Sequence, residues 1–123
     1  MNNNVKIVFF STLYALFNVI GAGMIKQELR TYTLDSISHY FYFLFKIKVM
    51  ISFAIILASA LMMFKAISLG NFSFISPIAT GINFFLTISI GYFIFKDNIT
   101  ILQVFGLILI FCGILCISIA ELK

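Results

Sequence analysis

Hydrophobic residues fill four long stretches of this chain, and polar residues are concentrated in the short segments between them. The stretches cover residues 5–24, 49–69, 73–95 and 101–120. Each is close to the ~20 residues that an α-helix needs to cross ~30 Å of hydrocarbon. The pattern predicts four transmembrane helices, with both termini on the same side of the membrane. We interpret the first stretch as a retained helix, because it is longer than the apolar region of a signal peptide and three more stretches follow.

The composition supports this class of protein. Hydrophobic residues make up 63% of the chain and charged residues 10%, with a single proline. The segments between the stretches are too short to form a separate soluble domain. We therefore expect an all-α integral membrane protein, a four-transmembrane-helix bundle that forms one membrane domain over residues 1–123.

Residues 36–48 (SISHYFYFLFKIK) fit neither a simple loop nor a membrane span. Five aromatic residues fall within positions 40–45, and Lys46 and Lys48 follow them. Such a segment is typical of the membrane interface, where aromatic rings lie at headgroup level and lysines reach toward lipid phosphates. The alternative is an elbow on the cytoplasmic side that gathers a lipid substrate.

The basic residues lie at the ends of the predicted helices. The net charge is +4, and in a membrane protein the available partner for this charge is anionic lipid, not nucleic acid. Five basic residues fall on the side of the first and third loops, and three on the other side. They are Lys26, Arg30, Lys46, Lys48 and Lys96 against Lys6, Lys65 and Lys123. The positive-inside rule then places those two loops in the cytoplasm and both termini outside.

The sequence offers little of the chemistry that enzymes use. Cys112 and Cys116 are one helical turn apart within an apolar span and lack histidine or carboxylate company, which favours lipid-facing or packing roles. His39 has no acidic neighbour, and there is no glycine-rich phosphate loop. We therefore predict no catalytic residue, no metal site and no cofactor.

The first predicted helix carries a polar stripe. Ser11, Tyr14, Asn18 and Gly21 recur at spacings of three, four and three residues, so they share one face of a helix. The amide of Asn18 is expensive in the middle of a span unless it meets a polar group, a cavity or a ligand. The stripe therefore indicates a site, although an amide bonded to another helix, worth roughly 1 kcal/mol, would also explain it.

The third predicted helix carries a second stripe. Its polar members are Ser76, Thr80, Asn83 and Thr87. The serine and threonine hydroxyls have a silent alternative, because they can bond back to their own helix. Asn83 is harder to explain in that way. We therefore expect the first and third helices to face a common polar cavity, whose amides cannot carry a titrating proton.

Two further features concern anions and association. Lys65 lies about one turn inside the end of its span, where it either extends outward or faces the bundle and neutralises an anionic ligand. In the last span, Gly106 and Gly113 are two turns apart on one face. Small residues allow helices to approach closely in lipid, so this face indicates association between chains, with packing inside one chain as the alternative.

Several segments resemble the small multidrug resistance family of the drug/metabolite transporter superfamily. They are NVIGAGMIK, KAISLGNFSFISPIATG, FKDNIT and GLILIFCGIL, and the resemblance covers almost the whole chain except residues 36–48. It implies a dimer, often antiparallel, that alternates access around a central cavity. It also implies that the last helix, with Gly106 and Gly113, supplies the dimer contact.

The chain departs from the family's cation exporters at the positions that bind cargo. On the resemblance, Asn18 stands where those exporters carry a glutamate that binds cation and proton in turn. Ser76 and Ala79 stand where they carry aromatic residues that cradle cationic drugs. An amide cannot exchange a proton, so these departures argue against proton-coupled cation export.

A related branch of the superfamily is more similar, namely the small four-helix flippases of undecaprenyl-phosphate-linked sugars such as aminoarabinose. The likeness implies that hydroxyl and amide groups bind the sugar, while Lys65 or Lys26 holds the phosphate as a point charge. The implied sugar ligands are Tyr14, Asn18, Ser76, Thr80 and Asn83.

The sequence thus predicts a multi-pass transporter of the bacterial inner membrane, most consistent with a flippase for a polyprenyl-phosphate-linked sugar. It would be a homodimer, or a heterodimer with a similar four-helix subunit, surrounded by membrane lipid. One alternative is an exporter of small cationic drugs or metabolites that uses Asn18 as a neutral ligand. A second is a non-transporting subunit of a heterodimer, because a subunit with a fixed orientation needs an oppositely oriented partner to build an antiparallel pair.

Overall fold

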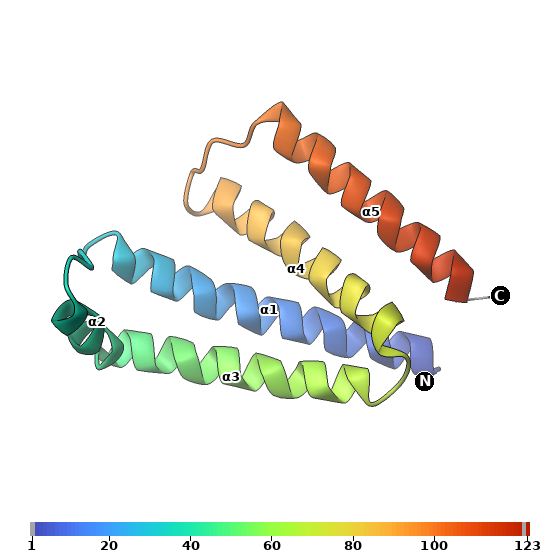
Figure 1. The fold of residues 1–123 in the computed structure, drawn as a ribbon, viewed down its shortest axis with the longest axis horizontal. Helices are drawn as coiled ribbons and strands as arrows, with labels where there is room; N and C mark the ends of the chain where they lie inside the picture. Colours follow the sequence, from blue (N-terminus) through green and yellow to red (C-terminus); the bar gives the residue numbers. More distant parts are fainter. Residues whose placement is uncertain (1, 122) are drawn as a thin grey trace.

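The chain folds into long helices connected by short segments (Figure 1). The computed structural model describes residues 2–121 and 123. Within them lie α1 (Asn3–Leu29), α2 (Ile37–Leu44), α3 (Ile47–Ile67), α4 (Phe72–Phe93) and α5 (Ile101–Glu121). α1, α3, α4 and α5 are each long and apolar enough to cross a membrane. The prediction of an all-α protein with four membrane-spanning helices is confirmed.

The four long helices alternate in direction, so both termini lie at one end of the molecule (Figure 1). We call this the terminal end. The opposite end, the α2 end, holds α2 and the loop between α4 and α5. α1 and α4 run in the same direction. The five basic residues of the first and third loops therefore gather at the α2 end, as the topology requires.

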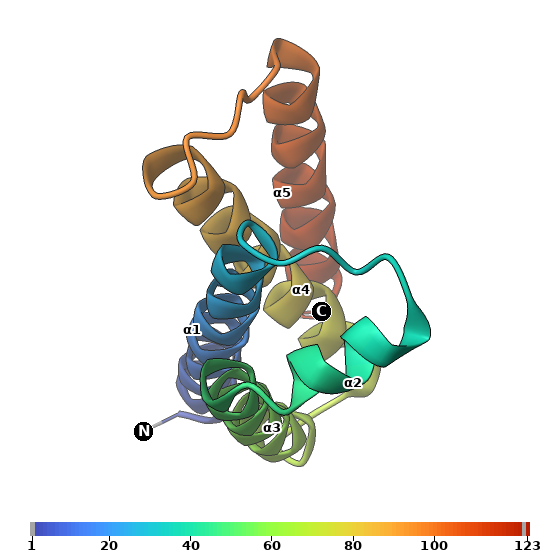
Figure 2. The same cartoon turned by 90° about the vertical axis from the view of Figure 1, so that its left-hand side faces the viewer.

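The aromatic segment forms the short helix α2, which lies crosswise to the long helices (Figures 1 and 2). Only Phe43 of this helix is buried, and its ring centroid lies 5.7 Å from that of Tyr32. Ile37, Phe41 and Phe45 are exposed. A short helix crosswise to the spans, with apolar residues exposed, has the geometry of an interfacial helix.

The core forms where α1 packs against α3 and α4. Every fourth residue of α1 is buried along this face: Ile7, Ser11, Ala15 and Val19. Near the terminal end, Ile7 clusters with Ala66 of α3 and Ile75 of α4. α1 therefore serves as the central helix, because it alone has extensive contacts with two other spans.

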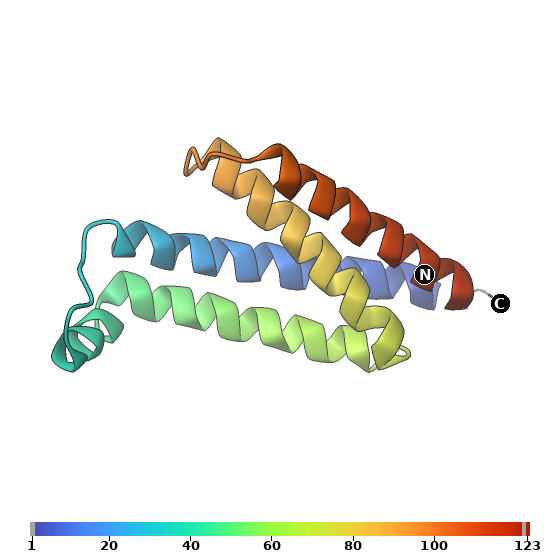
Figure 3. The ribbon, with the colours of Figure 1, turned by 45° about the horizontal axis from the view of Figure 1, so that its top comes forward.

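α5 is the least integrated helix. It packs only against α4 among the described elements, and none of its residues is buried (Figure 3). The side chain of Ile114 fills the space that a Cβ at Gly81 would take, which marks the closest point of the α4–α5 contact. In one chain alone, most of α5 has no protein neighbour.

The loop after α4 turns through a left-handed residue, Lys96, with φ 57°. Beyond it, the Asp97 N–H donates a hydrogen bond of 2.9 Å to the Gly91 carbonyl, which closes the end of α4. A lysine Cβ is disfavoured in this conformation, and glycine adopts it freely. The turn is therefore kept at an energetic cost.

Lys96→Gly is expected to raise the free energy of unfolding by about 0.5–1 kcal/mol, because relief of the left-handed strain exceeds the entropy cost of glycine. Thermal unfolding in detergent measures this gain in stability. Lys96→Ala is the matched control, since it removes the same charge but keeps the Cβ. Equal stability of the two variants would contradict the explanation.

Candidate functional site

Two polar atoms on neighbouring spans are buried without a hydrogen-bond partner in the described chain. They are the Ser11 hydroxyl oxygen on α1 and the side-chain carbonyl oxygen of Asn83, near the middle of α4. A buried polar group in hydrocarbon normally has a partner, because leaving it unpaired costs several kcal/mol. Both atoms are covered by the chain itself, so in this arrangement of the helices neither is open to a group from outside, and they mark two polar positions that the packing leaves unsatisfied.

Other hydroxyls on these helices are satisfied locally. Thr87 donates to the Asn83 backbone carbonyl at 2.8 Å, and Ser89 donates to the Phe85 carbonyl at 2.8 Å. The alternative that a hydroxyl only bonds back to its own helix is thus correct for Thr87. The side-chain amide of Asn83 differs, because its oxygen can only accept and meets no donor.

The remaining predicted sugar ligands lie closer to the surface of the chain. Tyr14, Asn18 and Ser76 are half-buried, and Thr80 is exposed. None of them lines the two pockets that open between α1 and α4 beside Phe95 or the hollow near the start of α1. The stripe on α1 also includes Gly21, which faces α3 and not α4. The structure therefore does not gather the five residues around one of these pockets, and their role as sugar ligands stays a prediction.

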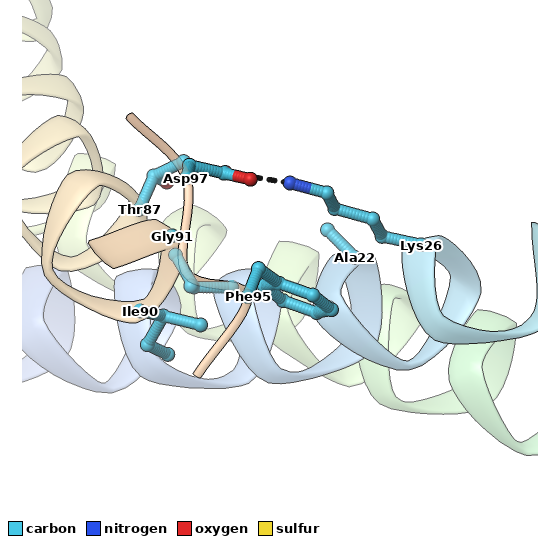
Figure 4. A pocket seen from close by; sticks show the side chains of 9 residues that line it. Ala22, Lys26, Thr87, Ile90, Gly91, Phe95 and Asp97 are labelled. Carbon is cyan, nitrogen blue, oxygen red and sulfur yellow. Dashed lines mark hydrogen bonds and ion pairs between the residues drawn. The ribbon is translucent and has the colours of Figure 1, made fainter. Parts of the chain in front are cut away.

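At the α2 end, α1 is bound to the α4–α5 loop by charged contacts (Figure 4). The Lys26 ammonium lies 2.7 Å from the Asp97 carboxylate and 4.5 Å from the centre of the Phe95 ring. Arg30 donates a 2.8 Å hydrogen bond to the Phe95 carbonyl, and its guanidinium carbon is 4.9 Å from the same ring. Phe95 is thus held by two cations from the end of α1.

Two pockets open between α1 and α4 beside Phe95. One has a volume of about 130 Å³, and Lys26, Asp97 and Thr87 lie along it with small residues such as Ala22 and Gly91. The other has a volume of about 200 Å³ and a largely apolar lining that includes Ile20, Met24 and Ile94. A third hollow, near the start of α1, is formed by that helix alone.

A second ionic cluster ties α1 to α3. Glu28 lies 3.2 Å from the Lys48 ammonium and 3.6 Å from that of Lys46. Lys46 is also 4.4 Å from the centre of the Tyr32 ring. The two lysines predicted to reach lipid phosphates therefore already have a protein partner, although Lys48 stays largely exposed.

The two predicted anion-binding lysines are at opposite ends of the bundle. Lys26 is at the α2 end, whereas Lys65 lies in the last turn of α3 at the terminal end and is exposed. In the single chain, Lys65 thus lies at the surface, which agrees with the alternative that its side chain extends outward and does not face the bundle. One phosphate cannot contact both lysines at once.

The two glycines of α5 face open space in the part of the chain that the structure describes. A Cβ placed at Gly106 or Gly113 would meet nothing within 4 Å. In the described residues nothing therefore packs against these two positions, and the contact between chains stays a prediction. Cys112 and Cys116 are exposed free thiols on the same helix.

No protein-family model, curated protein or solved structure matches this chain. The resemblance to the small multidrug resistance family therefore stays a prediction, and so does each role that it implies.

Sequence reasoning missed Asp97, Phe95 and Arg30 as members of one cluster. Lys26 and Asp97 are 71 residues apart. No local spacing links them, because the contact depends on how α1 and α4 align. The only signal in the sequence is indirect, namely that both loops are predicted on the same side of the membrane.

Proposed function

We propose that this chain is a subunit of a bacterial inner-membrane transporter that flips a polyprenyl-phosphate-linked sugar. The observation that carries the proposal is the unpaired carbonyl oxygen of Asn83, buried near the middle of a membrane-spanning helix. An acceptor at that depth needs a donor, and sugar hydroxyls or amines are donors. Because the chain itself covers this oxygen, a head group would reach it only when α4 shifts as access alternates, and the cost of leaving it unpaired would then be removed.

The charges support a cargo with an anionic phosphate. All four acidic residues, Glu28, Asp35, Asp97 and Glu121, lie at helix ends or in loops and not at the middle of a span. No carboxylate at mid-span would repel the phosphate or couple a proton to its movement. Lys26 offers a cation at the α2 end, so we expect facilitated flipping or exchange down a gradient.

The exposed helix α5 supports a dimer. It buries none of its residues in the single chain, and Gly106 and Gly113 leave open positions along it. A second four-helix subunit packed on α5 would enclose a path that one chain cannot enclose alone.

Asn83→Leu tests the proposal, because it removes the acceptor with little change in size. In proteoliposomes, we expect about tenfold slower flipping of a fluorescent short-chain polyprenyl-phosphate-linked sugar, read by a membrane-impermeant quencher. We also expect equal or higher thermal stability, since an unpaired buried group is lost.

Ser89→Ala is the matched control on the same helix, because its hydroxyl is already bonded to its own helix. It should flip the cargo at the wild-type rate. If Asn83→Leu flips normally, or if it loses stability in proportion to activity, Asn83 is a structural residue and the proposal fails.

A second candidate function is a non-transporting subunit that completes a heterodimer. Five of the eight basic residues lie on the side of the α2 end, which favours one fixed orientation in the membrane. Liposomes that contain this chain alone would then show no flipping, and a second, oppositely oriented four-helix subunit would restore it.

A further inference from the structure

Phe95 separates two adjacent pockets of different character. Both are lined by Val19, Gly23, Ile90 and Phe95, so they adjoin one another along one groove between α1 and α4. On one side of the ring the groove has a charged rim, Lys26 and Asp97. On the other side it is lined chiefly by aliphatic residues. A charged compartment joined to an apolar one matches an amphiphile with an anionic head and a hydrocarbon tail.

The compartments have the size of molecular groups, not of single waters. The charged one, at about 130 Å³, is far above the ~10–15 Å³ that a cavity needs to hold one water molecule. The apolar one, at about 200 Å³, takes part of a chain. A free phosphate would leave the second compartment empty, whereas a lipid would use both.

The depth of the groove fits a lipid headgroup. Lys26 lies in the last turn of α1, at the α2 end, where a helix of this length that crosses the membrane would reach its surface. Lysines at this level meet the phosphates of the lipid leaflet. The groove therefore lies at the depth of a lipid phosphate, with its apolar part beside the hydrocarbon.

The Lys26–Asp97 pair is suited to exchange one anion for another. Both side chains are nearly half exposed, at 45% and 46%, and exposed ion pairs contribute little to stability. The loop also has anchors that do not involve the Asp97 carboxylate: the Asp97 N–H bonds to the Gly91 carbonyl, and Arg30 bonds to the Phe95 carbonyl. The carboxylate can therefore leave Lys26 while the loop stays in place.

We propose that this groove binds one lipid through its phosphate, with Lys26 as the cation and Asp97 as a built-in competitor that occupies Lys26 when no lipid is bound. The inference rests on the proposed function only in the choice of Lys26 as the residue that meets the cargo's phosphate. Asp97 thereby sets the affinity and releases the lipid, and Phe95 separates head from tail.

Two variants that break the same ion pair test whether the pair controls lipid binding or only holds the α4–α5 loop against α1. Asp97→Asn frees Lys26, whereas Lys26→Gln removes the cation. If the pair only holds the loop, both variants should change the affinity for lipid in the same way. If the site binds lipid as proposed, the two variants should change the affinity for short-chain phosphatidic acid in opposite directions. A thermal-shift titration of the detergent-solubilised protein measures this affinity, because a ligand that binds the folded state raises the unfolding temperature.

We expect Asp97→Asn to bind phosphatidic acid roughly two- to fivefold more tightly and Lys26→Gln to bind it at least about tenfold more weakly. Inorganic phosphate and phosphatidylcholine of the same chain length should give no shift. Lys123→Gln, which removes one positive charge at the terminal end, should match the wild type.

A steric variant tests the groove without changing its charge. A Cβ at Gly23 would lie 3.6 Å from the Phe95 ring, an ordinary contact, so Gly23→Ala should fold and bind normally. Gly23→Leu should fill both compartments and abolish the shift with phosphatidic acid. If Gly23→Leu does not fold, the charge variants still decide the question.

The proposal is overturned if the two charge variants shift the affinity in the same direction, or if inorganic phosphate binds as well as phosphatidic acid. Its failure is distinct from that of the proposed function. If Lys26→Gln loses lipid binding but the wild type does not flip the cargo, the proposed transport function is wrong and the lipid site stands. If the wild type flips the cargo but the two charge variants change the affinity for phosphatidic acid in the same way, only the lipid site is wrong.

Discussion

Gly21→Leu is expected to disrupt the fold, lowering the free energy of unfolding by about 3 kcal/mol or more. A Cβ at this position would lie 2.6 Å from a side-chain carbon of Ile56 and 3.0 Å from the backbone carbonyl oxygen of Ser52. A backbone atom of a packed helix cannot move aside, so α1 and α3 must separate. That contact is the most extensive one between helices in the chain.

The measurement is thermal unfolding followed by circular dichroism, together with elution of the detergent-solubilised protein. Gly113→Leu is the matched control, because it makes the same change at a position with no atom within 4 Å. Gly113→Leu should unfold at the wild-type temperature when both proteins are diluted in detergent until they are monomeric, so that a weakened dimer does not contribute. Equal unfolding temperatures for Gly21→Leu and the wild type would show that α1 and α3 do not pack as described.

The double variant Gly106→Leu with Gly113→Leu is expected to abolish self-association while leaving each chain folded. Both glycines lie on one face of α5, and neither touches the rest of the chain. Leucines there would hold a second helix away, because close approach of backbones drives association in lipid. Energy transfer between differently labelled chains in liposomes measures the dimer.

Ile108→Phe with Leu115→Phe is the control for this experiment. Both residues are exposed on α5, and each follows one of the glycines by two residues, so they lie on the opposite face of the helix. This variant should associate like the wild type. Dimers that persist in the glycine variant would place the contact on another helix, and a loss of helix content would show that the glycines serve the single chain.

The four spans follow from the sequence because burial in lipid requires long apolar helices, and a run of ~20 apolar residues is visible without any neighbour. The ends of the helices do not follow from the apolar runs in the same way. The first stretch is predicted over residues 5–24, but α1 covers Asn3–Leu29. The extra turn carries Lys26 and Glu28, whose charges are met by Asp97 and by lysines near the start of α3. A helix continues past the hydrocarbon when its polar residues find partners.

The sequence by itself determined the class of protein, the number of spans and which residues share a helical face, since these depend only on helix period and hydrophobicity. Only the tertiary structure decided that Gly21 faces α3, that Asn83 keeps an unpaired oxygen whereas Thr87 does not, and that Lys26 meets Asp97. These facts depend on the rotation and register of helices against one another. Packing sets both, and no pattern within a single helix contains them.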